Sequence, residues 1–599
     1  MHRGMSVSVD QRASQANSPM QGLKRLMSYL KPYRLQLVIV TVLVIISTGL
    51  NVLGPYLIGL TIDRALIQLD LGELLRMVII LLSNYLISWL LHVLYGQIMA
   101  ETAQKAMRTM RQGLFDHMQK LSISYYDKQQ AGDLLSRLTN DMDAINQLLS
   151  QNFTSFIQSL SSLVGTLIMM FALSLSLTLA ALIVIPLSLV VTRMIMKRSR
   201  PAFQNLQKTL GGLNSLMEED IGGQRVIIAY GQQGRSLADF EVRNQTVKDA
   251  GIKANILAGL MPPIMGMLSN LNVIVVVGVG AYLLIQGIGN VTVGLITSFS
   301  EYTRRFGHPL NQIANLFNGV MAALAGAERI FEVLDTEPKI VDCENAARLD
   351  TIEGRVAFED VSFGYDPDTR VLNHINFTAV PGKTIALVGP TGAGKTTIIN
   401  LLTRFYDVDE GRILIDGKDL RELCQDDLRR QLGIVLQDTF LFADTVMENI
   451  RYGRLDATDE EVVQAAKLAN ADRFIRHLPE GYHTELSERG SNLSQGQRQL
   501  LSIARAILAE PAILILDEAT SSVDTRTEVE IQKALLNLMS GRTSFVIAHR
   551  LSTIRNADQI LVINEGELIE RGKHETLLEE KGFYYKLYTS QFKGLSIGV

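Results

Sequence analysis

The feature that most constrains the fold of this chain is a pair of long stretches without any charged residue. Neither 144–192 nor 254–300 contains Asp, Glu, Lys or Arg. Because a helix crosses a bilayer with about 20 mostly apolar residues, each stretch is long enough for a hairpin of two membrane-spanning helices. The turns are expected near Ser174–Ser176 and Gly287–Asn290, where polar residues and glycines interrupt the apolar runs. The first half of the chain is therefore predicted to be an α-helical membrane domain.

Two further apolar segments, 35–60 and 77–97, raise the expected number of membrane-spanning helices to six. The segments 98–143 and 193–253 contain six and ten Lys or Arg residues, whereas the two hairpin turns contain none. The positive-inside rule then places both charged segments and both chain termini in the cytoplasm.

These charged segments are helix-periodic, so the membrane helices are expected to continue well beyond the bilayer. About 20 extra helical residues reach about 30 Å, far enough to touch a soluble domain. The tips of these extensions are expected near 132–137 and 223–230. Before the first span, 22–33 is typical either of an amphipathic helix at the inner membrane surface or of the soluble end of that span.

In the second half of the chain, Gly389–Thr396 has the spacing G-x-x-x-x-G-K-T of a phosphate-binding loop. An apolar run over 383–388 predicts a strand before it, and 397–402 predicts a helix after it. Glycines let backbone N–H groups curl around a phosphate, while the lysine bridges phosphates and the next hydroxyl ligates Mg²⁺. The residues expected to hold ATP here are Gly389, Thr391, Gly392, Gly394, Lys395, Thr396 and Thr397.

A second apolar strand, 512–516, ends in Asp517 and Glu518. An acidic pair at the end of a buried strand suits a phosphate loop, because Asp517 can hold Mg²⁺ and Glu518 can orient and polarise the attacking water. The alternative is a buried strand that merely ends in two acidic residues.

Leu493–Gln497 precedes a helix by sequence pattern and alone would be a serine cap with a glycine turn. It also resembles the signature loop of ATP-binding-cassette (ABC) ATPases, and it stands about 20 residues before the acidic pair, as in that family. The departures from the family's commonest form, Gln495 and the sequence Ser-Ser-Val-Asp over 521–524, keep Ser494, Gly496 and Asp524. The resemblance makes Tyr365 the ring that stacks on adenine and Gln437 the glutamine that senses Mg²⁺. It places Asp524 in the loop that links the two sites and makes His549 the switch histidine.

A six-span half placed before the ATPase resembles the type IV (B-family) exporter half-transporters. The match is closest to the catalytically complete subunit of bacterial heterodimeric multidrug exporters. The fold implied is an α-helical membrane domain, with six transmembrane helices and long cytoplasmic extensions, fused to an α/β P-loop ABC ATPase domain. The expected domains are a disordered tail over 1–21, a transmembrane domain over 22–330, a linker over 331–353 and a nucleotide-binding domain over 354–599.

The resemblance also implies a mechanism. Two ATPase domains pair head to tail, and ATP on one chain meets the signature of the other. The catalytic residues are Glu518 and His549, Mg²⁺ is held by Thr396, Gln437 and Asp517, and the partner's ATP is contacted by Ser494, Gln495, Gly496 and Gln497. The function implied is ATP-driven export of hydrophobic or amphipathic compounds, drugs or lipids, across the inner membrane by alternating access. An ATP-gated channel or regulatory receptor on the same scaffold is the alternative.

The partner implied is a second half-transporter; a different subunit is expected, and a homodimer stays open. The net charge of −4 does not indicate a nucleic-acid partner. The two cysteines, Cys343 and Cys424, fall in the soluble half and indicate a reducing compartment without a disulfide framework.

The sixth expected span contains Glu301, Arg304, Arg305 and His308. Glu301 is expected about 15 Å deep, where a charge facing lipid costs a few kcal/mol. These side chains are expected to line a substrate path, with Met261 and Met265 as an adaptable apolar wall. The alternatives are an inter-helix ion pair and ordinary helix packing.

Overall fold

The computed structural model describes residues 19–343, 346–349, 351–366, 368–437, 439–518, 524–548 and 551–591. It divides the chain into two compact units. We call them the helical unit (1–119 and 131–336) and the α/β unit (120–130 and 337–599). The tail expected over 1–21 lies outside the described residues up to residue 18, and helix α1 begins at Pro19.

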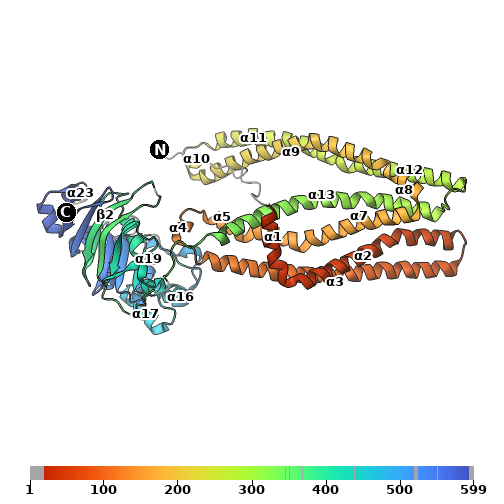
Figure 1. Cartoon of the computed structure of the whole chain (residues 1–599). Helices are drawn as coiled ribbons and strands as arrows, with labels where there is room; N and C mark the ends of the chain where they lie inside the picture. Colours follow the sequence, from red (N-terminus) through yellow and green to blue (C-terminus); the bar gives the residue numbers. More distant parts are fainter. Residues whose placement is uncertain are drawn as a thin grey trace. The chain divides into compact units, whose positions relative to one another are not determined.

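In the part that the structure describes, the helical unit consists of helices (Figure 1). They are α1 (Pro19–Leu30), α2 (Arg34–Thr61), α3 (Leu71–Met118), α5 (Ala131–Ser136), α6 (Met142–Gln147), α7 (Phe153–Leu173), α8 (Leu175–Leu182), α9 (Val184–Gly222), α10 (Gln224–Ala229), α11 (Gln233–Gly259), α12 (Met261–Ile285) and α13 (Val293–Asp335). Short 3₁₀ or π segments continue four of them, over Lys31–Tyr33, Ile62–Leu66, Arg137–Asp141 and Leu148–Asn152. Helices α2, α3, α7 and α13 pack together, and α9 pairs with α11.

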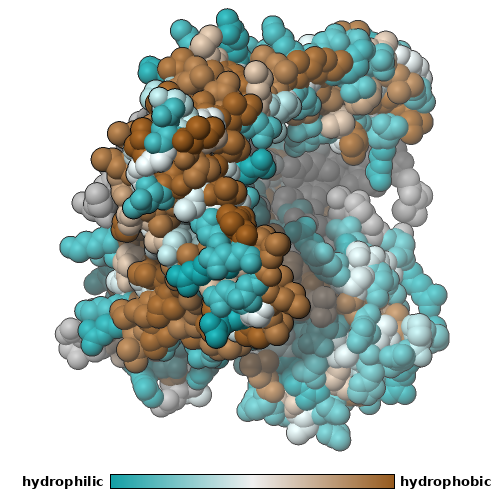
Figure 2. All heavy atoms as spheres, turned by 90° about the vertical axis from the view of Figure 1, so that its right-hand side faces the viewer, coloured by the Kyte–Doolittle hydropathy of each residue, from teal (hydrophilic) through white to brown (hydrophobic). Residues whose placement is uncertain are grey.

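Five helical stretches of the described chain are long and apolar enough to cross a membrane: 22–66, 71–118, 131–173, 175–222 and 233–285. Helix α13 is the sixth long helix and packs on α2, α7 and α12. It falls outside this group of five, and it contains the charged cluster that begins at Glu301. Hydrophobic side chains cover broad areas of the surface of this unit (Figure 2), as expected for helices that face lipid.

The two expected hairpin turns are confirmed. Ser174 separates α7 from α8 in an extended conformation, and its hydroxyl accepts a hydrogen bond from the N–H of Leu177. Between α12 and α13, Gly287 and Gly289 have φ of +67° and +76°, a region that glycine adopts without steric strain.

One of the two expected cytoplasmic tips is wrong. The break after α3 lies at 119–130, whereas 132–137 continues as helix into α6 and α7. Gly132 therefore does not end a helix, and its surroundings contain no atom that a side chain would meet. The second tip is confirmed, because α10 is bounded by Gly223 and by Gly231, whose φ is +64°.

Both ends of α13 are held by charged side chains. Asp63 accepts hydrogen bonds from the Gly294 N–H at 2.8 Å and from the Thr292 hydroxyl at 2.5 Å. At the other end, Arg25 of α1 forms an ion pair of 2.5 Å with Asp335. Helix α13 continues to Asp335 and so extends into the segment expected as a linker over 331–353. Its last turns bury apolar side chains such as Phe331, which ties this part of the segment to the helical unit.

The α/β unit contains two sheets. Their strands are β1 (Val356–Phe363), β2 (Leu372–Ala379), β3 (Thr384–Val388), β4 (Glu410–Ile415), β5 (Lys418–Asp419), β6 (Leu432–Val435), β7 (Ile513–Glu518), β8 (Thr543–Ala548), β9 (Gln559–Asn564) and β10 (Glu567–Gly572). One sheet has the antiparallel order β2-β1-β4-β5. The other has the order β10-β9-β3-β8-β7-β6 and is parallel from β9 to β6.

The larger sheet is buried on both faces. Ile385 and Leu387 of β3 join the core shared with the smaller sheet, whereas Ala386 and Val388 join the core on the other side, to which α19 and α20 contribute. This alternation follows from the two-residue period of a strand. The helices of the unit are α4 (Ile123–Tyr126), α14 (Lys395–Leu402), α15 (Gln425–Arg430), α16 (Val446–Arg451), α17 (Asp459–Leu468), α18 (Asp472–Ile475), α19 (Gln495–Leu508), α20 (Thr525–Met539), α21 (Leu551–Asn556), α22 (His574–Glu579) and α23 (Phe583–Gln591).

The segment 120–130, which contains α4, belongs to the α/β unit although it lies early in the sequence. The Ser122 hydroxyl accepts hydrogen bonds from the backbone N–H groups of Lys339 and Ile340, at 2.9 and 3.2 Å. We call 120–130 the docked segment.

Candidate functional site

The phosphate loop has the strand–loop–helix structure that its sequence predicts. Strand β3 ends at Val388 and α14 begins at Lys395. Between them Gly392 and Gly394 have φ of +82° and +104°. A side chain at Gly389 would bring its Cβ to 2.1 Å from the carbonyl oxygen of Ile563, so this position requires glycine.

Lys395 is buried and its ammonium lies over the loop itself. Its Nζ donates hydrogen bonds of 2.8 Å to the carbonyl oxygens of Gly389 and Pro390. Burial lowers the pKa of Lys395, while the nearby charge of Asp517 acts in the opposite direction. A phosphate oxygen is a stronger acceptor than a carbonyl oxygen, so the ammonium is placed to exchange these bonds for bonds to a phosphate.

Strand register brings the acidic pair to the same edge of the sheet as the phosphate loop. Ile547 of β8 is opposite Leu387 of β3 on one side and opposite Asp517 of β7 on the other. On the far side of β7, Gln437 follows β6 by two residues. Carboxyl ends of parallel strands thus place these groups at one edge, where ligands bind in open α/β sheets.

Two of the expected catalytic groups cannot be placed in this way. His549 lies outside the described residues, directly after the last residue of β8, and of Glu518 the structure describes the backbone in β7. Of the loop 521–524 it describes Asp524, which caps α20 by accepting a hydrogen bond of 3.0 Å from the Thr527 N–H. Backbone hydrogen bonding lowers the pKa of Asp524, so its carboxylate stays ionised.

The donor set at this edge fits Mg²⁺. Thr396 and Gln437 present an exposed hydroxyl and an exposed amide, and Asp517 contributes a half-buried carboxylate. Among the described residues no group of three or more His, Cys, Asp or Glu is arranged to hold a metal ion. Mg²⁺ in nucleotide sites needs no such group, because it is held by one or two protein oxygens together with phosphates and water.

Tyr365 lies beside the start of α14. Its hydroxyl donates to the Thr397 Oγ1 at 3.2 Å and accepts from the Asn400 Nδ2 at 3.0 Å. Its ring makes edge-to-face contacts with Phe363 and Tyr406, each at 5.0 Å between centroids. The expected adenine platform is thus adjacent to the phosphate loop helix.

The signature residues begin α19. The Ser494 hydroxyl accepts from the Gln497 N–H at 3.3 Å, and the Gln497 side chain accepts from the Ser494 N–H at 2.9 Å. This reciprocal cap stabilises the helix start. Ser494 is exposed and Gly496 buried, while Gln495 is half-buried. The N-terminus of α19, with its positive potential, therefore faces outward and is accessible to a second molecule.

In the helical unit, the residues expected to line a substrate path do not form one site. Arg305 lies 3.8 Å from Glu301 and donates at 3.4 Å to the carbonyl oxygen of Asn51 in α2. Met265 instead accepts from the Thr192 hydroxyl of α9 at 3.6 Å, and Met261 begins α12. Along their helices, Glu301 lies about 12 Å and Met265 about 30 Å from the turn between α12 and α13. The ion pair and the methionines are therefore at different depths.

Comparison with known proteins gives the family. A family model described as the ABC transporter transmembrane region matches residues 37–310. A second family model, described as ABC transporter, matches residues 372–521 in the α/β unit. An uncharacterised ABC transporter ATP-binding protein of Bacillus subtilis is 45% identical over 95% of this chain and 94% of its own length. This chain belongs to the ABC transporters.

Two other relatives of this ABC transporter have named substrates. A fatty acid ABC transporter ATP-binding/permease protein of Mycobacterium tuberculosis is 44% identical over 86% of this chain and 82% of its own length. An ATP-dependent lipid A-core flippase of Syntrophus aciditrophicus is 38% identical over 98% of this chain and 97% of its own length. The chain is an exporter-type half-transporter: a multi-pass membrane domain fused to an ATPase domain whose ATP hydrolysis is coupled to transport.

Sequence reasoning missed two residues next to the nucleotide site of this ABC transporter. Tyr406, four residues after α14, completes the aromatic cluster around Tyr365. Its hydroxyl is hydrogen-bonded to Asp127 of the docked segment. The aromatic pair Phe405-Tyr406 directly after the phosphate loop helix was the available signal, but nothing in the sequence connects it to a residue almost 280 positions earlier.

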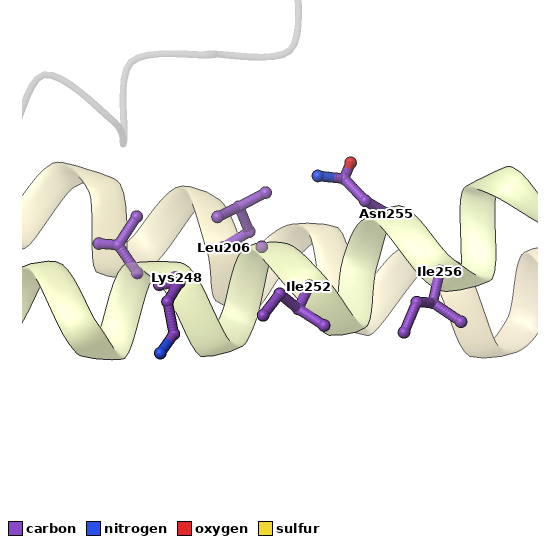
Figure 3. Close-up of a pocket in the computed structure, with 7 residues that line it drawn as sticks. Leu206, Lys248, Ile252, Asn255 and Ile256 are labelled. Atoms are coloured by element: carbon purple, nitrogen blue, oxygen red, sulfur yellow. The ribbon is translucent and has the colours of Figure 1, made fainter.

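One open groove of this ABC transporter lies outside the nucleotide site, between α9 and α11 (Figure 3). Ile252 and Ile256 point to one side of α11 with Lys248, and Asn255 points to the other. Most of the lining is aliphatic, and its polar groups do not converge. The groove is therefore typical of a helix-packing surface and not of a small-ligand site.

Proposed function

We propose that this ABC transporter exports amphipathic, lipid-like compounds from the cytoplasmic side of the cell membrane as one half of a dimer. The observation that carries the proposal is the single sheet edge on which the phosphate loop, Asp517 and Gln437 meet, in a chain whose other half is built from membrane-length helices. The distribution of Lys and Arg supports a cytoplasmic location for both termini.

At this edge, ATP is held by the loop residues, by Lys395 at its phosphates and by Tyr365 at its base. Mg²⁺ would be held by Thr396, Gln437 and Asp517 and would neutralise phosphate charge. Glu518 accepts the proton of the attacking water, and His549 binds the γ-phosphate. Glu518 comes at the end of β7, next to Asp517, which suits a base that must lie within reach of the metal.

The second half-transporter supplies the signature for this ATP, and Ser494, Gln495, Gly496 and Gln497 contact the ATP of the partner. The exposed Ser494 at the start of α19 and the exposed Asp524 support this arrangement, because both are accessible to a second molecule. Closure of the two ATPase domains drives the change of access. ATP can do this because it binds the closed pair more tightly than the open pair.

The substrate class follows from α13. Arg304 is exposed about 16 Å along the helix, and among the described residues it has no acidic partner. Arg305 forms a long ion pair of 3.8 Å with Glu301, and both side chains are about 40% exposed. A cation near the membrane midplane that is not fully neutralised favours an acidic substrate group. The named substrates of the relatives, fatty acid and lipid A-core, agree with acidic amphiphiles.

The test is transport in proteoliposomes with three amphiphiles of equal chain length: a carboxylate, an alcohol and a quaternary amine. We expect ATP-dependent accumulation of the carboxylate and none with Glu518→Gln. Arg304→Gln should lower carboxylate transport about tenfold, whereas Arg76→Gln, at an exposed pair with Glu73, should not.

The opposite results are equally informative. Preferred transport of the amine would contradict the acidic class but keep the exporter. ATP-dependent ion conductance without accumulation of any amphiphile would favour the gated channel.

A further inference from the structure

The aromatic cluster beside the nucleotide site connects two parts of the α/β unit that are far apart in sequence. Phe363, Tyr365 and Tyr406 contact one another edge to face, with centroids 5.0 to 5.5 Å apart. Tyr365 and Phe363 belong to the end of β1 and the turn after it, while Tyr406 follows α14. A shift of the Tyr365 ring therefore reaches Tyr406 by direct contact, because packed rings move together.

Tyr406 is in turn bonded to the docked segment. Its hydroxyl donates to the carboxylate of Asp127, and the next residue, Lys128, forms an ion pair of 3.4 Å with Asp366. Burial and the charge of Asp127 raise the pKa of Tyr406, so the hydroxyl remains a donor at neutral pH. Of two adjacent residues in the docked segment, Asp127 thus contacts the cluster and Lys128 contacts Asp366, the residue after Tyr365.

The cluster also has room to move. A cavity of about 410 Å³ is lined by Tyr365, Tyr406, Asp127 and Lys128, among others. The Tyr365 ring is held in place by its two hydrogen bonds to Thr397 and Asn400. A base that stacks on the face of this ring leaves both bonds in place, and the cavity next to Tyr365 and Tyr406 leaves space beside the rings.

We propose that Tyr406 is a positioning residue that connects the adenine base at Tyr365 to the docked segment through its hydrogen bond to Asp127. The proposal rests on the proposed ATP site and deepens it. The docked segment joins α3 to α5, so the response to the base is delivered where the ATPase domain meets the connection between two long helices. The phosphates bind the loop, whereas the base alone touches the cluster, so the two parts of ATP should have separable effects.

The experiment is hydrogen exchange, by mass spectrometry, of the full-length protein in the assembly it forms, under three conditions with Mg²⁺. These are no ligand, inorganic tripolyphosphate, and a non-hydrolysable ATP analogue. Peptides covering 389–402 report phosphate binding, and peptides covering 120–130 report the docked segment. We expect both ligands to protect 389–402, and the analogue alone to change exchange in 120–130 by twofold or more.

Tyr406→Phe removes the hydroxyl and keeps the ring. It should abolish the change in 120–130 while the dissociation constant of the analogue stays within threefold. The matched control is Tyr482→Phe, because Tyr482 donates to Asp472 at 2.7 Å in another part of the same unit. This control should behave as the unsubstituted protein does. Asp127→Ala removes the other partner of the same hydrogen bond at an exposed position. It should also abolish the change in 120–130, and it replaces Tyr406→Phe in the experiment if that variant does not fold.

Several outcomes would overturn the proposal. Tripolyphosphate could change exchange in 120–130 as much as the analogue does, or Tyr406→Phe could keep the response. The first outcome would mean that the docked segment follows the phosphate loop and not the base, and the second that the Tyr406 hydroxyl does not connect the base to the segment. If neither ligand protects 389–402, the proposed ATP site itself is wrong, and this inference is wrong with it.

Discussion

The two connections between the long helices of the helical unit differ in whether their side chains have partners within the chain or are exposed. The docked segment, between α3 and α5, is bonded to the α/β unit through Ser122, Asp127 and Lys128. The other connection, which contains α10, exposes apolar side chains: Val226 is 60% exposed, Ile228 57% and Tyr230 76%. Exposed apolar patches of this kind indicate a surface that another protein covers.

This difference supports the dimer. One connection of each chain has its docking surface on the α/β unit of the same chain. We infer that, in the proposed dimer, the α10 connection has its docking surface on the partner.

The largest effect is expected at the nucleotide site. Glu518→Gln should lower the rate of ATP hydrolysis at least about 100-fold, because a general base contributes about 10²–10⁴-fold. ATP binding should change little, so the docked segment should still respond to the ATP analogue. Steady-state hydrolysis and nucleotide affinity provide the measurement.

Glu510→Gln is the matched control for this substitution. Glu510 lies three residues before β7, is 71% exposed and makes a long ion pair of 3.8 Å with Arg454. It should hydrolyse ATP at the normal rate. Substantial turnover by Glu518→Gln would instead show that another group removes the proton.

A charge in the α10 connection should have the next largest effect. Ile228→Asp would place an unpaired carboxylate in the surface that we expect the partner to cover, and a buried unpaired charge costs several kcal/mol. Transport, and hydrolysis that depends on the dimer, should fall about 10- to 100-fold, with no change in the thermal stability of the chain, since Ile228 is exposed.

Leu455→Asp, at a leucine of the α/β unit that is 77% exposed, is the control and should be neutral. If both variants transport normally, α10 faces solvent and the two connections differ only in exposure.

The sequence predicted the parts of the site that are local. The phosphate loop, the acidic end of β7 and the serine cap of α19 each depend on fewer than ten consecutive residues, and each lies where expected. Their positions follow from strand and helix ends, which the amino-acid pattern determines directly.

The sequence could not predict what depends on distant packing. Gly132 suggested a helix tip, but the chain turns at 119–130, where it is held by bonds to Lys339 and to Tyr406. Met265 and Arg305 contact different helices, so the sequence could not show that they are apart, and the substrate path stays a prediction. Both cases concern residues whose surroundings are supplied by other elements.

A smaller effect is expected at Arg404, which contacts Val341 and Asp342 close to the site where Ser122 is bound. Arg404 is 3% exposed; it donates to the carbonyl oxygen of Leu423 at 3.0 Å and pairs with Asp407 at 3.2 Å and with Asp342 at 3.6 Å. Both carboxylates are 35% exposed and can be hydrated, so losing Arg404 costs less than the ~3–5 kcal/mol of a fully buried pair. Arg404→Met should therefore lower the thermal stability of the α/β unit by several degrees and weaken the docking of Ser122 on the neighbouring Lys339.

Arg412→Met is its control. The Arg412 pair with Glu359, at 2.7 Å, is about half exposed on both sides, and such pairs contribute about 1 kcal/mol or less. Equal losses in the two variants would mean that the buried network does not hold this segment.

The smallest effect is expected at Lys128. Its ion pair with Asp366 is 3.4 Å long, and the two side chains are 59% and 70% exposed, so its contribution is about 1 kcal/mol or less and decreases with salt. Lys128→Gln should leave hydrolysis, stability and the response of 120–130 to the ATP analogue nearly unchanged. Because Lys128 is adjacent to Asp127, this variant separates charge attraction from the hydrogen bond of Tyr406. If Lys128→Gln abolishes the response at low and high salt alike, the docked segment is connected to Asp366 and not to the aromatic cluster.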